Sequence, residues 1–593
     1  MSASRERPTL VPSLYAYAKG LRDAAPEAPL PRRGLPLPEH ARPPRVPYDG
    51  PRLPEALGVV TDLVRPFLAD PDPERAATEV ERLLAGTGIG DRVVFAGVKD
   101  IAVPPPADPG ARDRARALAR CLTRGGTTLA AVTAGLGLLT RLGEPEDVPY
   151  LRVLGLLQGL GLHVVRTLAP LDRKAAAVVW LVHRARADAL RGLVDALAGG
   201  DEAAARDRLR DLPTAPRELG TEHAWRIADA VGLPDLLRRE PDDPGLLALA
   251  LRLLTRMSGS RGYEHAVLAY GEAVALIEAV AARAHELPTT PGHQARLVSL
   301  ALDLHSGAAH FLPWPPGRRR AVTAALLAVV GEPGSPPDRE GRRRADWVRR
   351  TARELRTAVP VAASAEPRLR IEVAVADPGD PDVVETRFLV DGRPLVPSVF
   401  GRGPGGSPEA LLAGGALRAG PEPKEVRLAE AYCTEDCCGA LYVTVRREGA
   451  HVVWDGWRRP GMPPGLPTPR AYRFDADAYE AEIARAEQDL SWTWPARETA
   501  WLIGAGLRER PELLARWGLR RGWISTDFQV PDTTVVGLHG PPPSAGGTAG
   551  TEQSALPYLW RLPDDGTPPE EQAARALRRL ADSDPRGYPE LRG

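Results

Sequence analysis

Apolar residues recur at helical spacing through the first half of the chain, and at alternate positions through much of the second half. Between residues 108 and 359 they return every three or four positions, in segments joined by short Gly/Pro turns. Residues 92–98, with three valines and a phenylalanine, are consistent with an isolated strand. The spacing predicts helices at residues 54–68, 72–84, 111–123, 127–142, 147–160, 173–185, 190–197, 246–257, 264–284, 294–311 and 318–330.

One helical segment carries a recognisable motif. Residues 142–154 read Leu-Gly-Glu-Pro-Glu-Asp-Val-Pro-Tyr-Leu-Arg-Val-Leu: Gly143 can end one helix, and Asp147 and Pro149 can open the next. The segment resembles the start of a HEAT repeat of the short bacterial type, over one repeat of roughly thirty residues. The resemblance implies an α-solenoid that presents a long surface to a partner. A compact helical bundle is the alternative.

Alternation marks the second half as α+β. Residues 368–376 and 383–390 alternate as strands, and Asp391-Gly392 offers a tight hairpin turn into a further strand at 394–400. From Leu441 to Val445 the odd positions are apolar, so they should be buried, with the even positions more exposed. Further elements are expected as helices at 408–412, 476–490, 498–507, 511–517 and 567–580, and as a strand at 522–530.

These elements predict a multidomain protein. An N-terminal all-α HEAT-like solenoid or bundle is followed by an α+β domain with an antiparallel sheet. A cut near Ser335 or Ala363 should then leave two folded fragments. The expected domains are a poorly ordered Pro/Arg-rich arm at 1–52, a helical domain at 53–359, an α+β domain at 360–540, a flexible linker at 541–556, and a C-terminal strand and helix at 557–593 that packs on the α+β domain.

Composition narrows the class of protein. Lys+Arg and Asp+Glu both total 77, so no net field directs the 593-residue chain to nucleic acid or acidic lipid. The first thirty residues lack the apolar core of a secretory signal, and the longest apolar stretch, residues 127–139, is too short to cross a bilayer. Four cysteines in so long a chain do not form a disulfide framework. We expect a cytoplasmic protein with reduced thiols and no membrane association.

The best candidate for chemistry is a hairpin that contains Cys433, Cys437 and Cys438. Three thiolates near a turn can hold zinc, with His451 on the next strand or Asp436 as a fourth ligand. A reversible disulfide from Cys433 to Cys437 or Cys438 is a second interpretation. The third, which is favoured, treats the cysteines as small apolar residues packed in a sheet. A site here would lie at the sheet edge, close to the flexible glycine-rich loop at 401–407.

Residues 339–356 form the most basic segment of the chain. Arginine suits phosphate, which makes a nucleic-acid contact conceivable. Acidic residues are interspersed, however, and a solvated helix that joins the two halves is the better interpretation. The arginines that could contact an anion are Arg342, Arg343, Arg344, Arg349 and Arg350.

No complete catalytic motif occurs in the sequence: there is no Gly-x-Ser-x-Gly, no His-Glu-x-x-His and no phosphate-binding Gly-Lys-Ser/Thr loop. The sequence therefore predicts a cytoplasmic interaction or scaffold protein with a helical surface for a protein partner. Its α+β module has no assigned activity, and no cofactor is required. The alternatives are a thiol- or zinc-dependent enzyme or sensor at the cysteine hairpin, and nucleic-acid binding through residues 339–356, which the charge balance disfavours.

Overall fold

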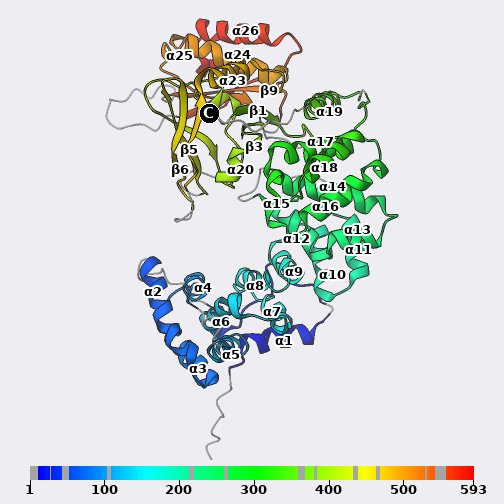
Figure 1. Cartoon of the computed structure of the whole chain (residues 1–593), viewed down its shortest axis with the longest axis vertical. Coiled ribbons are helices and arrows are strands. Elements are labelled where there is room, and N and C mark those ends of the chain that lie inside the picture. The colour runs from blue at the N-terminus through cyan, green and yellow to red at the C-terminus, as the bar shows by residue number, and fades with distance from the viewer. Residues whose placement is uncertain are drawn as a thin grey trace, which may run out of the picture. The chain divides into compact units, whose positions relative to one another are not determined.

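An all-helical region, residues 14–357, precedes a region of antiparallel sheets and helices, so the predicted fold class is confirmed (Figure 1). By compactness the chain divides into unit 1, Met1–Leu253, and unit 2, Leu254–Gly593. The predicted boundary near residue 360 marks the change from helices to sheets, while by compactness the last helices belong to unit 2 together with the sheets. The computed structural model describes residues 11–26, 28–42, 53–102, 109–212, 219–259, 265–334, 336–357, 368–379, 384–431, 438–462, 468–527, 530–540 and 556–592.

Unit 1 consists of helices that pack on near neighbours in the chain. Helices α4, α6, α8, α9 and α12 form a row in which each packs against the next, and we call it the helix row (Figure 1). Within the described ranges, none of the helices of either unit has both the length and the apolar composition needed to cross a bilayer. The helices of unit 1 are α1 (Leu14–Ala24), α2 (Leu53–Val64), α3 (Pro73–Ala85), α4 (Asp91–Lys99), α5 (Pro109–Gly125), α6 (Leu129–Leu142), α7 (Val148–Leu154), α8 (Gly161–Leu168), α9 (Arg173–Arg184), α10 (Asp188–Gly199), α11 (Glu202–Arg210), α12 (Thr221–Val231) and α13 (Leu233–Arg239), and α14 (Pro244–Ser258) crosses into unit 2.

Two expectations for unit 1 are wrong. Residues 92–98 form helix α4 and not a strand, because Val94, Phe95 and Val98 share one helical face that is buried among α2 and α6. Part of the arm that was expected to be poorly ordered forms α1, which Ser13 caps by accepting a hydrogen bond from the Ala16 N–H. Helix α1 packs on α5 and α7.

Residues 129–154 fold as a helix, a short turn and a second helix. Helix α6 ends at Leu142 with Gly143 as its cap, a 3-10 turn (Pro145–Asp147) follows, and Pro149 lies in the first turn of α7. Asp147 does not cap α7. Its fully buried carboxylate instead accepts the Glu144 N–H at 2.9 Å and pairs with Arg120 Nε of α5 at 2.8 Å. The turn is therefore fixed to the preceding helix pair.

Unit 2 combines helices with three antiparallel sheets, ordered β1-β2-β3, β4-β5-β6-β7 and β11-β10-β9-β8. Its helices are α15 (Ala266–Ala269), α16 (Ala273–Arg283), α17 (Pro291–Ser306), α18 (Arg318–Ala328), α19 (Arg339–Thr357), α20 (Leu395–Val399), α21 (Pro408–Leu411), α23 (Ala476–Gln488), α24 (Pro495–Glu509), α25 (Glu512–Ala515) and α26 (Pro569–Asp582). Its strands are β1 (Leu369–Val375), β2 (Val384–Val390), β3 (Arg393–Pro394), β4 (Lys424–Glu430), β5 (Ala440–Glu448), β6 (His451–Arg458), β7 (Tyr472–Asp475), β8 (Arg520–Thr526), β9 (Thr533–Gly540), β10 (Leu556–Pro563) and β11 (Leu591–Arg592).

The hairpins of unit 2 follow the sequence pattern closely. Leu441, Val443 and Val445 are fully buried while Tyr442 and Thr444 are partly exposed, which confirms the predicted faces of β5. The Asp391-Gly392 turn is also confirmed, with φ of 53° and 73° at the two residues. The strand expected at 394–400 is wrong. Only Arg393–Pro394 pairs with β2, and α20 then begins at Leu395.

Each part of unit 2 has its own aromatic core. Trp454 lies at the centre of one, with edge-on contacts to Phe388 and Phe474 at 5.7 Å and to Tyr479 at 6.2 Å. The second core lies between the β8–β11 sheet and helices α24 and α26, and contains fully buried Trp560. Strand β10 pairs with β9 and α26 packs on α24, so the C-terminal strand and helix complete this second layer.

Candidate functional site

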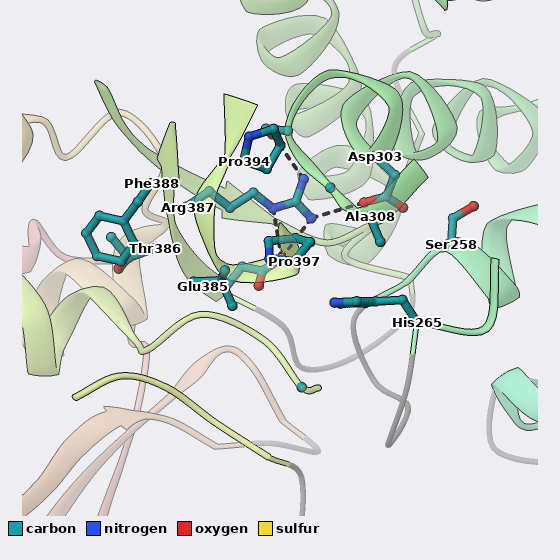
Figure 2. Close-up of a pocket in the computed structure, with 14 residues that line it drawn as sticks. Ser258, His265, Asp303, Ala308, Glu385, Thr386, Arg387, Phe388, Pro394 and Pro397 are labelled. Atoms are coloured by element: carbon teal, nitrogen blue, oxygen red, sulfur yellow. Dashed lines mark hydrogen bonds and ion pairs between the residues drawn. The ribbon is translucent and has the colours of Figure 1, made fainter. Parts of the chain in front are cut away.

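A buried group of charged side chains in unit 2 joins helix α17 to β2. Glu385 and Arg387 lie two positions apart on the strand, so their side chains leave the same face. Asp303 and Ser306 lie three positions apart on α17, so they share one face of the helix. Figure 2 shows the guanidinium of Arg387 between the carboxylates of Glu385 and Asp303. We call these four residues the polar cluster.

Arg387 is the hub of the polar cluster. Its Nε donates to Glu385 Oε1 at 2.8 Å and its Nη2 donates to Asp303 Oδ1 at 3.0 Å. Its Nη1 donates to Ser306 Oγ at 3.1 Å and to the Leu302 carbonyl at 3.3 Å. The side chains of Arg387, Asp303 and Glu385 are 11%, 10% and 6% exposed, so solvent screens these ion pairs little.

The protonation of the polar cluster follows from burial and charge. Burial raises the pKa of Asp303 to about 6, and the opposing attraction of Arg387 does not outweigh it. Burial also acts to lower the pKa of Arg387, but the charges of Glu385 and Asp303 outweigh it and hold this pKa above its usual range. Arg387 therefore stays a cation, whereas Asp303 can take up a proton in weakly acidic solution.

A small cavity lies beside the polar cluster, lined in part by Ser258, His265 and Thr386 (Figure 2). Within the described ranges, Ser258 Oγ, His265 Nε2 and Thr386 Oγ1 are buried without a hydrogen-bond partner. Burial lowers the pKa of His265 to about 4, so the imidazole is neutral near pH 7. The space open to the centre of a water molecule is about 20 Å³, and one water needs about 10–15 Å³. The cavity therefore has room for about one water molecule and is too small for an organic substrate.

The glycine-rich loop at 401–407, which was expected to be flexible, is bound to strands on both of its sides. Gly405 N–H donates to Glu385 Oε2 at 2.9 Å, and Gly406 accepts a hydrogen bond from the Thr386 N–H at 2.9 Å. A Cβ on Gly405 would lie 2.3 Å from the Thr386 carbonyl oxygen, so only glycine fits here. The loop therefore closes one side of the polar cluster, and its Gly405 N–H supplies a hydrogen bond to the carboxylate of Glu385.

The cysteine hairpin is only partly described. Cys433 and Cys437 lie outside the described residues, so their separation stays a prediction. Cys438 is buried just before β5, and its carbonyl accepts a hydrogen bond from Arg402 Nη1 at 3.1 Å. This contact confirms that the cysteine end of the hairpin lies beside the 401–407 loop.

The structure does not bring His451 to the cysteine end. His451 opposes Glu448 at the far end of β5, eight residues beyond Ala440, which is about 26 Å along an extended strand. Its Nδ1 lies 3.1 Å from Arg473 Nη2. His451 and Cys438 therefore do not share one zinc site, and a site at the cysteine end that includes Cys433 and Cys437 stays a prediction. Among the described residues no group of three or more His, Cys, Asp or Glu side chains could hold a metal ion.

The Arg-rich segment is helix α19, but it is not the solvated connector that we expected. Trp347 is buried and its Nε1 donates to the Val375 carbonyl at 3.0 Å. The five candidate arginines all contact groups of unit 2: Arg342 the Pro337 carbonyl, Arg343 the carboxylate of Asp532, Arg344 that of Asp377, Arg349 that of Asp346, and Arg350 the Ser491 carbonyl. Arg343, Arg344 and Arg350 therefore attach α19 to other parts of unit 2, whereas Arg349 pairs within the helix and Arg342 contacts the segment just before it.

Sequence reasoning missed the polar cluster, although part of its signal was present. Glu385 and Arg387 lie at alternate positions of a strand whose other residues, apart from Thr386, are apolar, which places two charges on one face. Nothing in the sequence connects them to Asp303, which lies 84 residues away. Comparison of the chain with protein-family models, with curated proteins and with solved structures finds no match.

Proposed function

We propose that this chain is a cytoplasmic protein-interaction scaffold in which the helix row of unit 1 receives a protein partner. The order of packing carries the proposal: α4, α6, α8, α9 and α12 each pack on the next. Packing between near neighbours is the logic of α-solenoids, whose extended surfaces bind other proteins. The HEAT-like turn between α6 and α7 lies within this array and supports the same interpretation.

The helix row also carries an apolar side chain that a partner could cover. Leu162 on α8 is 40% exposed, while the next residues His163, Val164 and Val165 are buried. Unit 2, by contrast, uses its polar cluster to join α17 to β2, which is a structural role. The partner-binding role is therefore assigned to unit 1.

Site-specific photo-crosslinking tests this function. A benzophenone amino acid at position 162 of the full chain, in the cells that produce it, should give a discrete crosslinked protein. Position 559 on β10 is the matched control, because Leu559 is 36% exposed and lies in unit 2. The crosslinked protein, once purified, should bind the full chain, and L162E should weaken that binding by about ten-fold while L559E leaves it unchanged.

Two results would contradict the proposal. One is the same set of crosslinked products from positions 162 and 559, which would indicate non-specific capture. The other is a purified partner whose affinity is the same for L162E and for the wild-type chain.

A further inference from the structure

A second pocket, in unit 1, has an apolar floor and a cationic rim. Buried Ala205, Leu209 and Leu236 contribute to the floor. Lys174 of α9, Arg206 of α11 and Arg239 of α13 stand at the rim, so three helices supply one cation each. We call these residues the cationic pocket.

A single carboxylate of the chain already lies between two of these cations. Glu202, at the start of α11, has one oxygen 3.8 Å from Lys174 Nζ and the other 3.8 Å from Arg239 Nη1. Both distances exceed a hydrogen bond, and the Glu202 side chain is 70% exposed. Glu202 is therefore weakly held and can be displaced at small cost.

The third cation is held differently. Arg206 Nη1 pairs with Glu240 Oε1 at 2.9 Å, while its Nε is buried and has no hydrogen-bond partner among the described residues. The three cations face two carboxylates, so the pocket has an excess of one positive charge. A ligand carboxylate that takes the place of Glu202 exchanges one negative charge for another and keeps this balance.

The size of the cationic pocket agrees with that choice. The space open to the centre of a water molecule is about 40 Å³, or roughly three water-sized groups at about 10–15 Å³ each. A carboxylate has three heavy atoms. The apolar floor suits a hydrophobic side chain next to it in sequence, and burial of that side chain would add affinity.

We infer that the cationic pocket binds an acidic segment of a protein partner, with a carboxylate between Lys174 and Arg239 in the place of Glu202 and an apolar neighbour on the floor. The inference rests on the proposed scaffold function and names the chemistry that its partner presents. Glu202 acts as an internal competitor for the site.

Fluorescence anisotropy with the full chain tests the inference. The probes are a fluorescein-labelled Gly-Ser-Leu-Glu-Leu-Ser amide and the same peptide with Gln for Glu. The Glu peptide should bind about ten-fold more tightly, as expected for one charge-assisted pair. E202Q should raise the affinity for the Glu peptide about three-fold by removing the competing charge. R239A should lower it about ten-fold.

Arg238 provides the matched control, because it is the adjacent residue of α13, is exposed, and pairs with Asp235 outside the pocket. R238A should bind the Glu peptide like the wild type. Equal binding of the two peptides, no anisotropy change with either, or equal effects of R238A and R239A would overturn the inference. Tighter binding of inorganic phosphate than of the Glu peptide would assign the pocket to phosphate instead and overturn it as well.

The two proposals can fail separately. A partner that crosslinks from position 162 and binds R239A normally would remove the cationic pocket from the interface and leave the scaffold function in place. Peptide binding that R239A abolishes, without any specific crosslink from position 162, would support the cationic pocket and remove the helix row as the partner-binding surface.

Discussion

Replacing Asp303 by Asn should make unit 2 more stable at pH 7 and leave its stability nearly unchanged at pH 4. Burial raises the pKa of this carboxyl to about 6 in the folded protein, against about 3.9 for an aspartate in an unfolded chain. The folded state therefore binds the proton more tightly. Asp303 contributes stability that is complete below about pH 4 and is lost as the pH rises through about 6.

The magnitude follows from the difference between the two pKa values. About 2 units correspond to about 3 kcal/mol, which is the largest gain that D303N can give at pH 7. The amide keeps an oxygen that can accept from Arg387 Nη2, so the hydrogen bond is retained while the charge is removed. Arg387 keeps Glu385 as its counter-charge, so D303N does not leave the buried cation unpaired.

Urea unfolding of both proteins at pH 4 and pH 7, followed by tryptophan fluorescence, measures this difference in the unit 2 transition. Burial lowers the pKa values of His265 and His310 to about 4, so their contributions are present above about pH 6.5 and are lost as the pH falls through about 4. These contributions are common to both proteins and cancel in the comparison. D346N is the control, because Asp346 is an exposed residue of unit 2, and its effect should stay below about 0.5 kcal/mol at either pH.

A D303N protein that is less stable than the wild type at pH 7, with a smaller deficit at pH 4, would refute the reasoning. It would show that the ionised carboxylate of Asp303 is favoured by Arg387 more strongly than burial disfavours it.

Three further outcomes are expected. R387M should lower the free energy of unfolding of unit 2 by about 3–5 kcal/mol in urea titrations, since it leaves buried carboxylates without their cation, and an unchanged midpoint would contradict a central role for Arg387. G405A should lower the melting temperature and the free energy of unfolding, the latter by about 1–3 kcal/mol, because its Cβ must push the Thr386 carbonyl away. G420A is the control: its Cβ meets none of the described atoms within 4 Å, so its stability should be unchanged. H451A should retain whatever zinc the wild-type chain holds, as measured by elemental mass spectrometry, and a loss of one zinc per chain would reinstate His451 as a ligand.

Local patterns in the sequence predict the local structure of this protein well. The apolar positions of β5 and the Asp391-Gly392 turn depend only on neighbouring residues, and both are confirmed. The strand predicted at residues 92–98 is wrong because valine is typical of strands, while the spacing of these residues also fits a helix face. Packing against α2 and α6 favours the helix. The strand expected at 394–400 failed because pairing with β2 ends at Pro394.

The candidate site depends on contacts that no local pattern records. Arg387 was visible as a charge in an apolar strand, but its partner Asp303 lies on a helix that the sequence assigned to another domain. The sequence predicts that the arginines of α19 are solvated, because acidic residues lie among them in the same helix. In the structure Arg343 and Arg344 instead pair with Asp532 and Asp377, which are distant in sequence. Alternation and helical spacing report which face of an element is buried, and they do not report what buries it.

The link between α17 and β2 determines how this chain can be divided for expression. A fragment that ends near residue 360 would keep Asp303, Ser306 and Trp347 but lose Arg387 and the Val375 carbonyl that they contact. Such a fragment carries an unpaired carboxylate and an uncovered indole, and it should be insoluble. The compact units meet within α14, so a coding sequence for unit 2 should begin in the turn between α13 and α14, residues 240–243.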